Sequence, residues 1–216
     1  MQAEKIVYFV RHGQSMDNAS PVFQSPDSPL TEKGKEQARK ISERIAKLSF
    51  EALISSSFRR AKETAGFIAE ATGKNVEYSD LFVERTKPAS VNGRPYSDEK
   101  ASALWDKWNE SLYVPGMRAE DGENFDDIIA RANDALAFLK NRSERSMVVV
   151  THGYFLRTML ARVLVGGSLT GEILKKFQHA AMMENTGLTV LEYQSESGKT
   201  DARWRLWVYN DHAHLG

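Results

Sequence analysis

The sequence predicts an α/β protein, a three-layer sandwich with a mostly parallel central sheet, helices on both faces and an irregular helical insertion. Three observations predict this fold. The runs Ile6–Val10 and Met147–Val150 consist of apolar and aromatic residues only, which is typical of strands buried on both faces. Stretches with apolar residues at helical spacing alternate with the strands. The chain has 216 residues, 41% hydrophobic and 27% charged, so we expect residues 1–216 to form a single domain.

The first third of the chain alternates strands and helices. The strand Ile6–Val10 leads into a polar loop over residues 14–29 that contains several prolines. Capping residues and apolar spacing then predict a helix that begins after Thr31, a short buried strand at Ala52–Ile54, a helix that runs to about Thr72 with Gly73 as its C-cap, and a weak strand at Val76–Tyr78.

Residues 81–117 are less regular, because prolines and glycines interrupt them around a helix expected at about Ser97–Ser111. We interpret this stretch as a lid-like insertion. Its aromatic residues could line a substrate pocket or form the insertion's own core, and their helical spacing favours the core. These residues are Tyr96, Trp105, Trp108 and Tyr113.

The rest of the chain returns to regular elements. We expect an amphipathic helix from Phe125 to Leu139, the strand Met147–Val150, a helix after His152, a helix over Thr170–Gln178, and strands at Thr189–Tyr193 and Trp204–Val208. The two late strands are expected to form a hairpin across Ser195–Lys199. Such a hairpin would place an antiparallel strand at one edge of the sheet.

The composition excludes several classes of protein. The formal net charge is +0, so no basic excess points to nucleic acid or a membrane surface. Cysteine is absent, which excludes disulfides, thiolate metal sites and a cysteine nucleophile. No apolar run approaches membrane-spanning length, and residues 1–5 show no signal-peptide pattern. We therefore expect a cytoplasmic protein.

Unusual residues follow three of the expected strands. The first strand ends in Arg11-His12-Gly13, the second is followed by Arg59-Arg60, and the strand Met147–Val150 is followed by His152-Gly153. The carboxyl ends of parallel strands lie at one edge of the sheet, where ligands bind in open α/β folds. We therefore expect two histidines and at least two arginines to meet in one pocket.

A phosphoryl group is the ligand that fits this set best. Arginine presents a fork of donors suited to phosphate, and the N-terminus of the helix after His152 adds backbone N–H groups. Because the arginines neutralise charge, no metal and no other cofactor is required. A neutral histidine in this setting can act as the nucleophile and form a phosphohistidine, while the second histidine stabilises the charge on the phosphoryl oxygens.

The sequence resembles the histidine phosphatase superfamily, which includes the cofactor-dependent phosphoglycerate mutases. The similarity extends over nearly the whole chain and begins with Arg11-His12-Gly13, the family's signature tripeptide. Further segments that resemble the family are Asp27–Gly34 with Gln37-Ala38, Ser55-Ser56 with Arg60-Ala61 and Thr64-Ala65, Gly122-Glu123 opening a helix, Thr151-His152-Gly153, Asn185-Thr186-Gly187, and Asn210-Asp211 with His214-Leu215.

The resemblance implies a role for each matching residue. His12 would be the nucleophile and Glu84 the general acid, which would later activate water as a base. Between the neighbours Arg59 and Arg60, the family spacing favours Arg60. The residues that would bind the phosphoryl group are Arg11, Asn18, Arg60 and His152.

Three functions remain open from the sequence. We favour a metal-independent phosphatase that hydrolyses a small phosphorylated substrate through phosphohistidine. The alternative is a phosphoglycerate mutase, but relatives close to the mutases carry a Gly-aromatic-Glu-Gly-like segment soon after the acid, and Glu84 is followed by Arg85-Thr86-Lys87-Pro88-Ala89-Ser90. A catalytically silent module that only binds phosphorylated ligands ranks last, because His12 and the other expected site residues are all present. The sequence predicts neither the substrate nor the oligomeric state.

Overall fold

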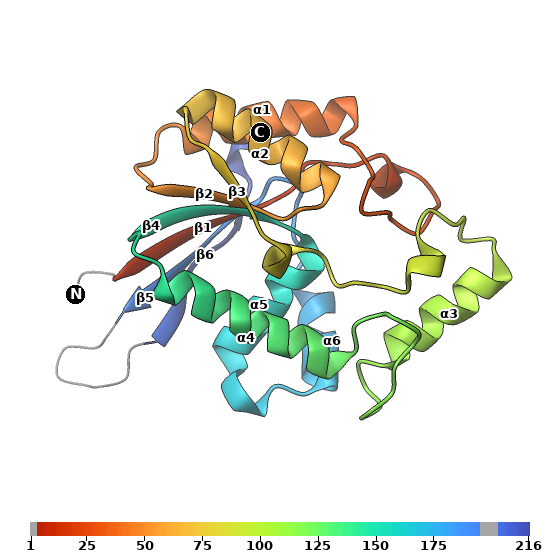
Figure 1. Ribbon diagram of the computed structural model, residues 1–216. Coiled ribbons are helices and arrows are strands. Elements are labelled where there is room, and N and C mark those ends of the chain that lie inside the picture. The colour runs from red at the N-terminus through yellow and green to blue at the C-terminus, as the bar shows by residue number, and fades with distance from the viewer. Residues whose placement is uncertain (1–3, 195–202) are drawn as a thin grey trace.

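The computed structural model describes residues 4–194 and 203–216, and it contains one six-stranded sheet (Figure 1). The strands are β1 (Lys5–Arg11), β2 (Ala52–Ser55), β3 (Val76–Tyr78), β4 (Ser146–Thr151), β5 (Leu188–Gln194) and β6 (Arg203–Asp211). Every strand predicted from the sequence is therefore confirmed. The hairpin expected across Ser195–Lys199 lies outside the described residues.

The α-helices alternate with the strands as predicted. They are α1 (Glu32–Ile45), α2 (Arg59–Thr72), α3 (Glu99–Glu110), α4 (Phe125–Asn141), α5 (Gly153–Val165) and α6 (Gly171–Ala180). Short 3-10 turns, which the sequence patterns did not predict, include residues 17–19, 80–82 and 89–91.

The strand order is β3-β2-β4-β1-β5-β6. The first four strands in this order are parallel, and β5 runs antiparallel to both β1 and β6. The prediction of a mostly parallel sheet is confirmed, but the expected position of the antiparallel strand is wrong. β5 lies inside the sheet because it inserts between β1 and β6, and β6, which runs with the parallel set, forms the edge.

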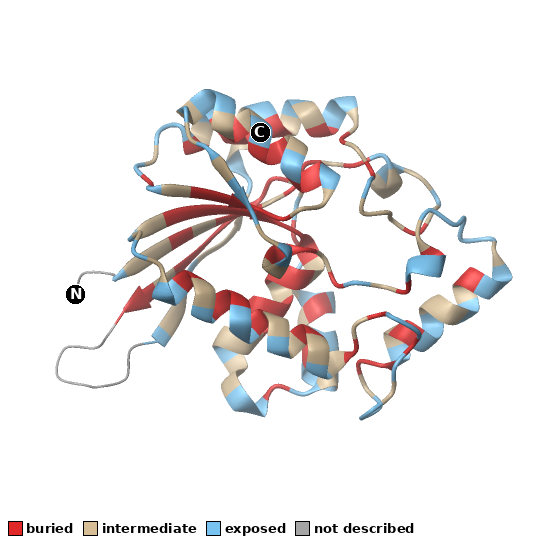
Figure 2. Cartoon of the chain, viewed as in Figure 1, coloured by how far each residue is buried: buried red, intermediate tan, exposed pale blue. Residues whose placement is uncertain are grey.

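Helices cover both faces of the sheet, which confirms the three layers (Figure 1). The helices α1 and α2 pack on one face through Ile41, Ile45 and Ile68. The helices α4 and α5 pack on the other face against Val7 and Phe9 of β1. Figure 2 shows the buried strands in the middle and exposed residues along the outer sides of the helices. The long apolar run of β1 follows from this burial, since both its faces are covered.

Local signals fix the helix ends. The hydroxyl of Thr31 accepts from the backbone N–H of Gly34 at the start of α1, and Gly73 ends α2 with a φ of 68°, so both predicted caps are confirmed. The next helix, α4, begins at Phe125 as predicted, just after the family-like segment Gly122-Glu123. Asn124 is the N-cap of α4 and forms a reciprocal capping box with Asp127.

The insertion at residues 81–117 extends away from the sheet, and α3 stands apart from the other helices at the right of Figure 1. Asp98 caps α3 through the backbone N–H of Ala101. Phe23, from the loop after β1, packs against Val91 and Ala101, so the insertion has a small core of its own. In the described part of the chain, no helix is long and apolar enough to cross a membrane.

Candidate active site

The sheet brings the predicted residues to one edge. Arg11 ends β1 opposite Thr151 of β4, and the backbone N–H of His12 donates to the carbonyl of Thr151 at 3.0 Å. Ser56, directly after β2, donates its backbone N–H to Val150 at 2.9 Å. The carboxyl ends of β1, β2 and β4 therefore converge, as their parallel direction predicts.

His12 lies in the centre of this edge and is only 2% exposed. Its Nδ1 is 2.7 Å from the carbonyl oxygen of Gly13, which can only accept, so Nδ1 carries the ring proton. The other nitrogen, Nε2, accepts from Nε of Arg60 at 3.1 Å. Burial, followed by the charges of Arg60 and Arg11, holds the pKa of His12 well below 6.5. His12 is thus neutral, with the lone pair on Nε2.

Arg60 is as buried as His12, at 2% exposed, and begins α2. Its Nη1 donates to the carbonyl of Ser25 at 3.0 Å, and burial lowers its pKa to about 10, which leaves it charged at neutral pH. Arg59, by contrast, is exposed and pairs with Glu63 along the helix. The structure therefore brings Arg60 to the histidines and leaves Arg59 at the surface.

His152 is fully buried, with its ring centroid 4.9 Å from that of His12. Its Nε2 lies 2.7 Å from Oγ of Ser56, and Oγ also accepts from the backbone N–H of Phe58 at 3.2 Å. Within the described chain, the hydroxyl proton of Ser56 has no other acceptor, so it is donated to Nε2. The ring proton of His152 then lies on Nδ1, which is buried without a partner among the described residues.

Arg11 joins the pocket from β1. Its Nη1 donates to the carbonyl of Met183, while its Nε is buried with no partner among residues 4–194 and 203–216. A Cβ placed on Gly153, the first residue of α5, would lie 3.1 Å from that Nε. The guanidinium therefore lies against the N-terminus of α5, and both favour an anion at this position.

Two glycines let the loop after β1 pass close to α1. A Cβ on Gly13 would lie 2.5 Å from the carbonyl oxygen of Gly34, and a Cβ on Gly34 would lie 2.0 Å from the carbonyl oxygen of Gln14. No side chain fits into these spaces. The backbone N–H of Gly13 also donates to Oγ1 of Thr64 at 3.1 Å, which ties the His12 loop to α2.

Glu84 comes from the insertion and reaches the same edge. Its Oε1 accepts from the backbone N–H groups of Phe155 at 2.8 Å and Arg85 at 2.9 Å, and its Oε2 accepts from Tyr154 at 3.0 Å. The carboxylate thus sits at the N-terminus of α5, next to His152. Arg131 of α4 holds the backbone of this segment, because it donates to the carbonyls of residues 81, 83 and 84.

Asn18 is the predicted site residue that these contacts do not connect to the histidines. It lies in the 3-10 turn 17–19, where its Oδ1 accepts from the backbone N–H and hydroxyl of Ser15. These bonds hold the loop after His12 together. A direct contact between Asn18 and a phosphoryl group stays a prediction.

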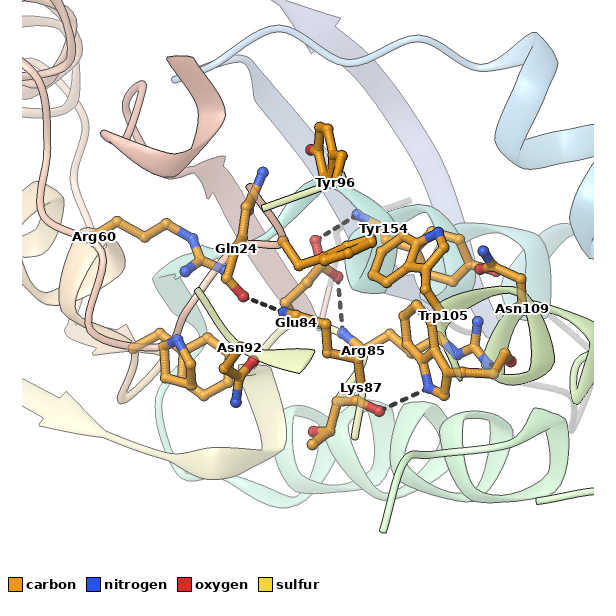
Figure 3. Close-up of a pocket in the computed structure, with 15 residues that line it drawn as sticks. Gln24, Arg60, Glu84, Arg85, Lys87, Asn92, Tyr96, Trp105, Asn109 and Tyr154 are labelled. Atoms are coloured by element: carbon orange, nitrogen blue, oxygen red, sulfur yellow. Dashed lines mark hydrogen bonds between the residues drawn. The ribbon is translucent and has the colours of Figure 1, made fainter. Parts of the chain in front are cut away.

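A cavity of about 370 Å³ adjoins this cluster, and Arg60 and Glu84 line it (Figure 3). Arg60 lies at one end of the residues drawn, with Trp105, Asn109 and Tyr154 at the other and Glu84 between them. The aromatic side chains that line the cavity are those of Phe23, Phe58, Tyr96, Trp105, Trp108 and Tyr154.

Both possibilities left open for the insertion's aromatic residues occur, because Trp105 packs against its small core and also lines the cavity. Trp108 is buried and stacks on Arg85, but Tyr96 and Trp105 also line the cavity. Tyr113 lies elsewhere, in a separate hollow beside Gly171. Helical spacing did not separate these cases because one face of α3 serves both the small core and the cavity.

Three residues to which the sequence patterns assigned no role in the site shape this region. Ser56 orients His152, Arg131 supports Glu84, and Lys87 donates to the backbone carbonyl of Gln24 while it lines the cavity. Burial, followed by repulsion from Arg60, lowers the pKa of Lys87 to about 8. In the described part of the chain, no three His, Asp or Glu side chains gather closely enough to hold a metal ion.

A neutral imidazole that accepts from Arg60 and lies in the field of Arg11, at the carboxyl edge of an α/β sheet, is suited to phosphoryl groups. The chain belongs to the histidine phosphatase superfamily (branch 1), whose family model matches residues 7–205. This superfamily includes both phosphatases and mutases. The resemblance stated from the motifs is thereby confirmed.

Relatives of both activities are similar over nearly the full length. The probable phosphoglycerate mutase GpmB of Photorhabdus laumondii subsp. laumondii is 32% identical, over 97% of this chain and 94% of that protein. Two mycobacterial structures are 26% identical. Mycobacterial hydrolase 1 matches with a TM-score of 0.75 over 97% of this chain and 100% of its own. A mycobacterial glucosyl-3-phosphoglycerate phosphatase matches with a TM-score of 0.72 over 95% and 98%.

Proposed function

We propose that the protein is a metal-independent phosphatase that hydrolyses phosphomonoesters through a phosphohistidine on His12. The observation that carries this proposal is the state of the His12 ring. Gly13 fixes the proton on Nδ1, and burial beside two arginines keeps the ring neutral, so that Nε2 presents a lone pair inside a cationic pocket. A nucleophile of this kind can attack phosphorus without prior loss of a proton.

In the first half of the reaction, Nε2 of His12 attacks the phosphorus and the bond from phosphorus to the ester oxygen breaks. Arg60 now donates to Nε2, so the incoming phosphoryl oxygens must take over that N–H. Glu84 protonates the departing oxygen. Its Oε2 accepts a single N–H, from Tyr154, and therefore has a free lone pair that can carry this proton.

In the second half, water attacks the phosphorus and the bond to Nε2 breaks, which releases phosphate and restores the neutral ring. Glu84, now ionised, takes the proton of the attacking water. The unpartnered Nε of Arg11 and Nδ1–H of His152 are donors available to the phosphoryl oxygens in both halves. Asn18 would add a further donor from the loop. Preorganised donors of this kind account for much of the rate in phosphoryl transfer.

The residues around the cavity support hydrolysis over the mutase reaction. A mutase must hold a small sugar acid while it turns and must exclude water from the phosphoenzyme. The segment after Glu84, Arg85-Thr86-Lys87-Pro88-Ala89-Ser90, lacks the Gly-aromatic-Glu-Gly-like pattern of relatives close to the mutases. The glycerate part of phosphoglycerate also has no aromatic group that would use the aromatic lining of the cavity.

Phosphoglycerate mutase is the second candidate, because the relative at 32% identity carries that name. Both functions share the phosphohistidine, and the fate of the phosphoryl group distinguishes them. Interconversion of 2- and 3-phosphoglycerate well above the rate of phosphate release would favour the mutase.

The test is release of phosphate from a broad panel of phosphomonoesters with a chelator present. We expect turnover with the chelator and loss of turnover in His12→Ala. Arg59→Ala is the matched control, since this neighbour of Arg60 is exposed and should leave turnover unchanged. Full activity of His12→Ala would contradict the mechanism.

A further inference from the structure

The cavity beside Glu84 must receive the part of the substrate that leaves with the ester oxygen, and its walls indicate what that part is. Resting on the proposed function, we infer that the leaving group carries a planar nitrogen heterocycle, so that the substrate class is nucleoside 5′-monophosphates. Three properties of the cavity lead to this inference: free aromatic faces, unused amide groups and fixed positive charge.

The aromatic faces are not all used by the protein's own packing. Phe23 and Trp108 are buried, and the guanidinium of Arg85 lies 3.7 Å above the ring of Trp108. Tyr96, in contrast, is 52% exposed and contacts Phe23 only edge to face, with ring centroids 4.9 Å apart. Trp105 is half-buried, with its ring centroid 4.9 Å from that of Phe23 and 4.7 Å from that of Trp108. Both residues line the cavity, so a flat ring can stack on the exposed surface of Tyr96 and on the part of Trp105 that faces the cavity. Base stacking of this kind recurs wherever proteins bind unpaired nucleobases.

Amide side chains also line the cavity. Asn92 follows the 3-10 turn 89–91, and Asn109 lies near the end of α3. Neither amide makes a side-chain hydrogen bond to another described residue, so each offers an N–H donor and a carbonyl acceptor. Paired donors and acceptors match the edge of a nucleobase such as adenine, whereas a hydrocarbon ring would leave them unused.

The charges of the cavity exclude a different aromatic-binding ligand. Aromatic walls can also bind a quaternary ammonium group such as choline. Here Arg60, Arg85 and Lys87 line the same cavity, with Glu84 as the single acidic residue of the lining. A cationic leaving group would be repelled, while a neutral base next to a phosphate would not.

The experiment compares AMP with ribose 5-phosphate, because both release a primary alcohol and differ in the base. Stacking of about 1–3 kcal/mol per base corresponds to about 5- to 140-fold in kcat/KM in favour of AMP. Benzyl phosphate is also an ester of a primary alcohol. Its ring can stack but has no hydrogen-bonding groups, so it separates the contribution of stacking from that of hydrogen bonds to the base. We expect its kcat/KM to lie between those of the other two.

Substitution of residues that line the cavity tests whether the preference for AMP arises there. Tyr96→Leu and Trp105→Leu should lower the ratio of AMP to ribose 5-phosphate, and Asn92→Ala with Asn109→Ala should lower the ratio of AMP to benzyl phosphate. Trp207→Leu is the matched control, since Trp207 is 68% exposed on β6 and lies outside the cavity lining. It should change neither ratio.

Equal kcat/KM values for AMP and ribose 5-phosphate in the wild type would overturn the inference and leave the phosphatase proposal intact. The inference would also be overturned if the Tyr96 and Trp105 variants kept the wild-type ratio. If no phosphomonoester is hydrolysed, the proposed function itself fails. The two failures are therefore distinguishable.

Discussion

Replacement of Ser56 by alanine tests how the second histidine is held. Oγ of Ser56 bonds to Nε2 of His152 at 2.7 Å and to the backbone N–H of Phe58 at 3.2 Å, and both Ser56 and His152 are fully buried. Ser56→Ala leaves these two groups unpaired, which should cost about 1–3 kcal/mol of the free energy of unfolding. The ring of His152 also loses the donor that places its proton on Nδ1.

The expected loss of kcat follows from the position of that proton, because the proposed mechanism uses Nδ1–H of His152 as a donor to the phosphoryl oxygens. Loss of one oriented donor to the transition state typically costs about 10²–10³ in kcat, and a ring that still samples the productive tautomer retains part of its effect. We therefore expect kcat to fall about 10- to 100-fold, with a smaller change in KM. Ser55→Ala is the matched control. Ser55 is equally buried but donates to the carbonyl of Ser56 at 2.9 Å, so its loss should lower stability without this loss of kcat.

Steady-state kinetics and denaturant unfolding of both serine variants provide the measurement. If Ser56→Ala and Ser55→Ala have the same kcat, then the bond to His152 does not position a catalytic donor, and the reasoning is refuted. A loss of stability in Ser56→Ala alone would not rescue it, because that loss is expected of any buried serine.

Two further predictions follow from the same region. Gly34→Ala places a Cβ 2.0 Å from the carbonyl oxygen of Gln14 and should lower the free energy of unfolding by about 3 kcal/mol or more. Gly66→Ala lies on the exposed side of α2 with open space around it, and it should raise the free energy of unfolding by about 0.5–1 kcal/mol. Thermal unfolding of both variants measures these changes, and equal effects would contradict the close approach at Gly34. Burial lowers the pKa of Lys87 to about 8, so its ammonium group is charged below that pH and neutral above it. KM for a phosphomonoester dianion should therefore rise as the pH passes 8, and Lys87→Met should lose this rise in the same pH series. The same rise in Lys87→Met would show that Lys87 does not cause it.

The edge of the sheet that carries the site could be predicted from the sequence because its signals are local. The apolar runs of β1 and β4 are followed directly by His12 and His152, and parallel strands bring such ends together. The order of the strands in the sheet could not be predicted in the same way. The residues of a short strand do not specify which strands it pairs with, so only the structure shows that β5 lies between β1 and β6.

The finer parts of the site depend on residues far apart in the chain. Ser56 and His152 are 96 residues apart, and nothing in the local pattern around Ser56 distinguishes it from Ser55. The cavity likewise combines Phe23 from the loop after β1, Trp105 from α3 and Tyr154 from α5. The sequence shows that these residues are aromatic, but it does not show that they line one cavity, because they come together only in the folded chain.

In the proposed mechanism, the phosphoryl group passes through Nε2 of His12. The most direct measurement is rapid chemical quench with substrate labelled in the phosphoryl group, under alkaline conditions that preserve phosphohistidine, followed by peptide mapping. We predict label on the peptide that contains His12, up to one phosphoryl group per chain, and none in His12→Ala. Turnover in the wild type without label on His12, or label on another residue, would contradict the mechanism.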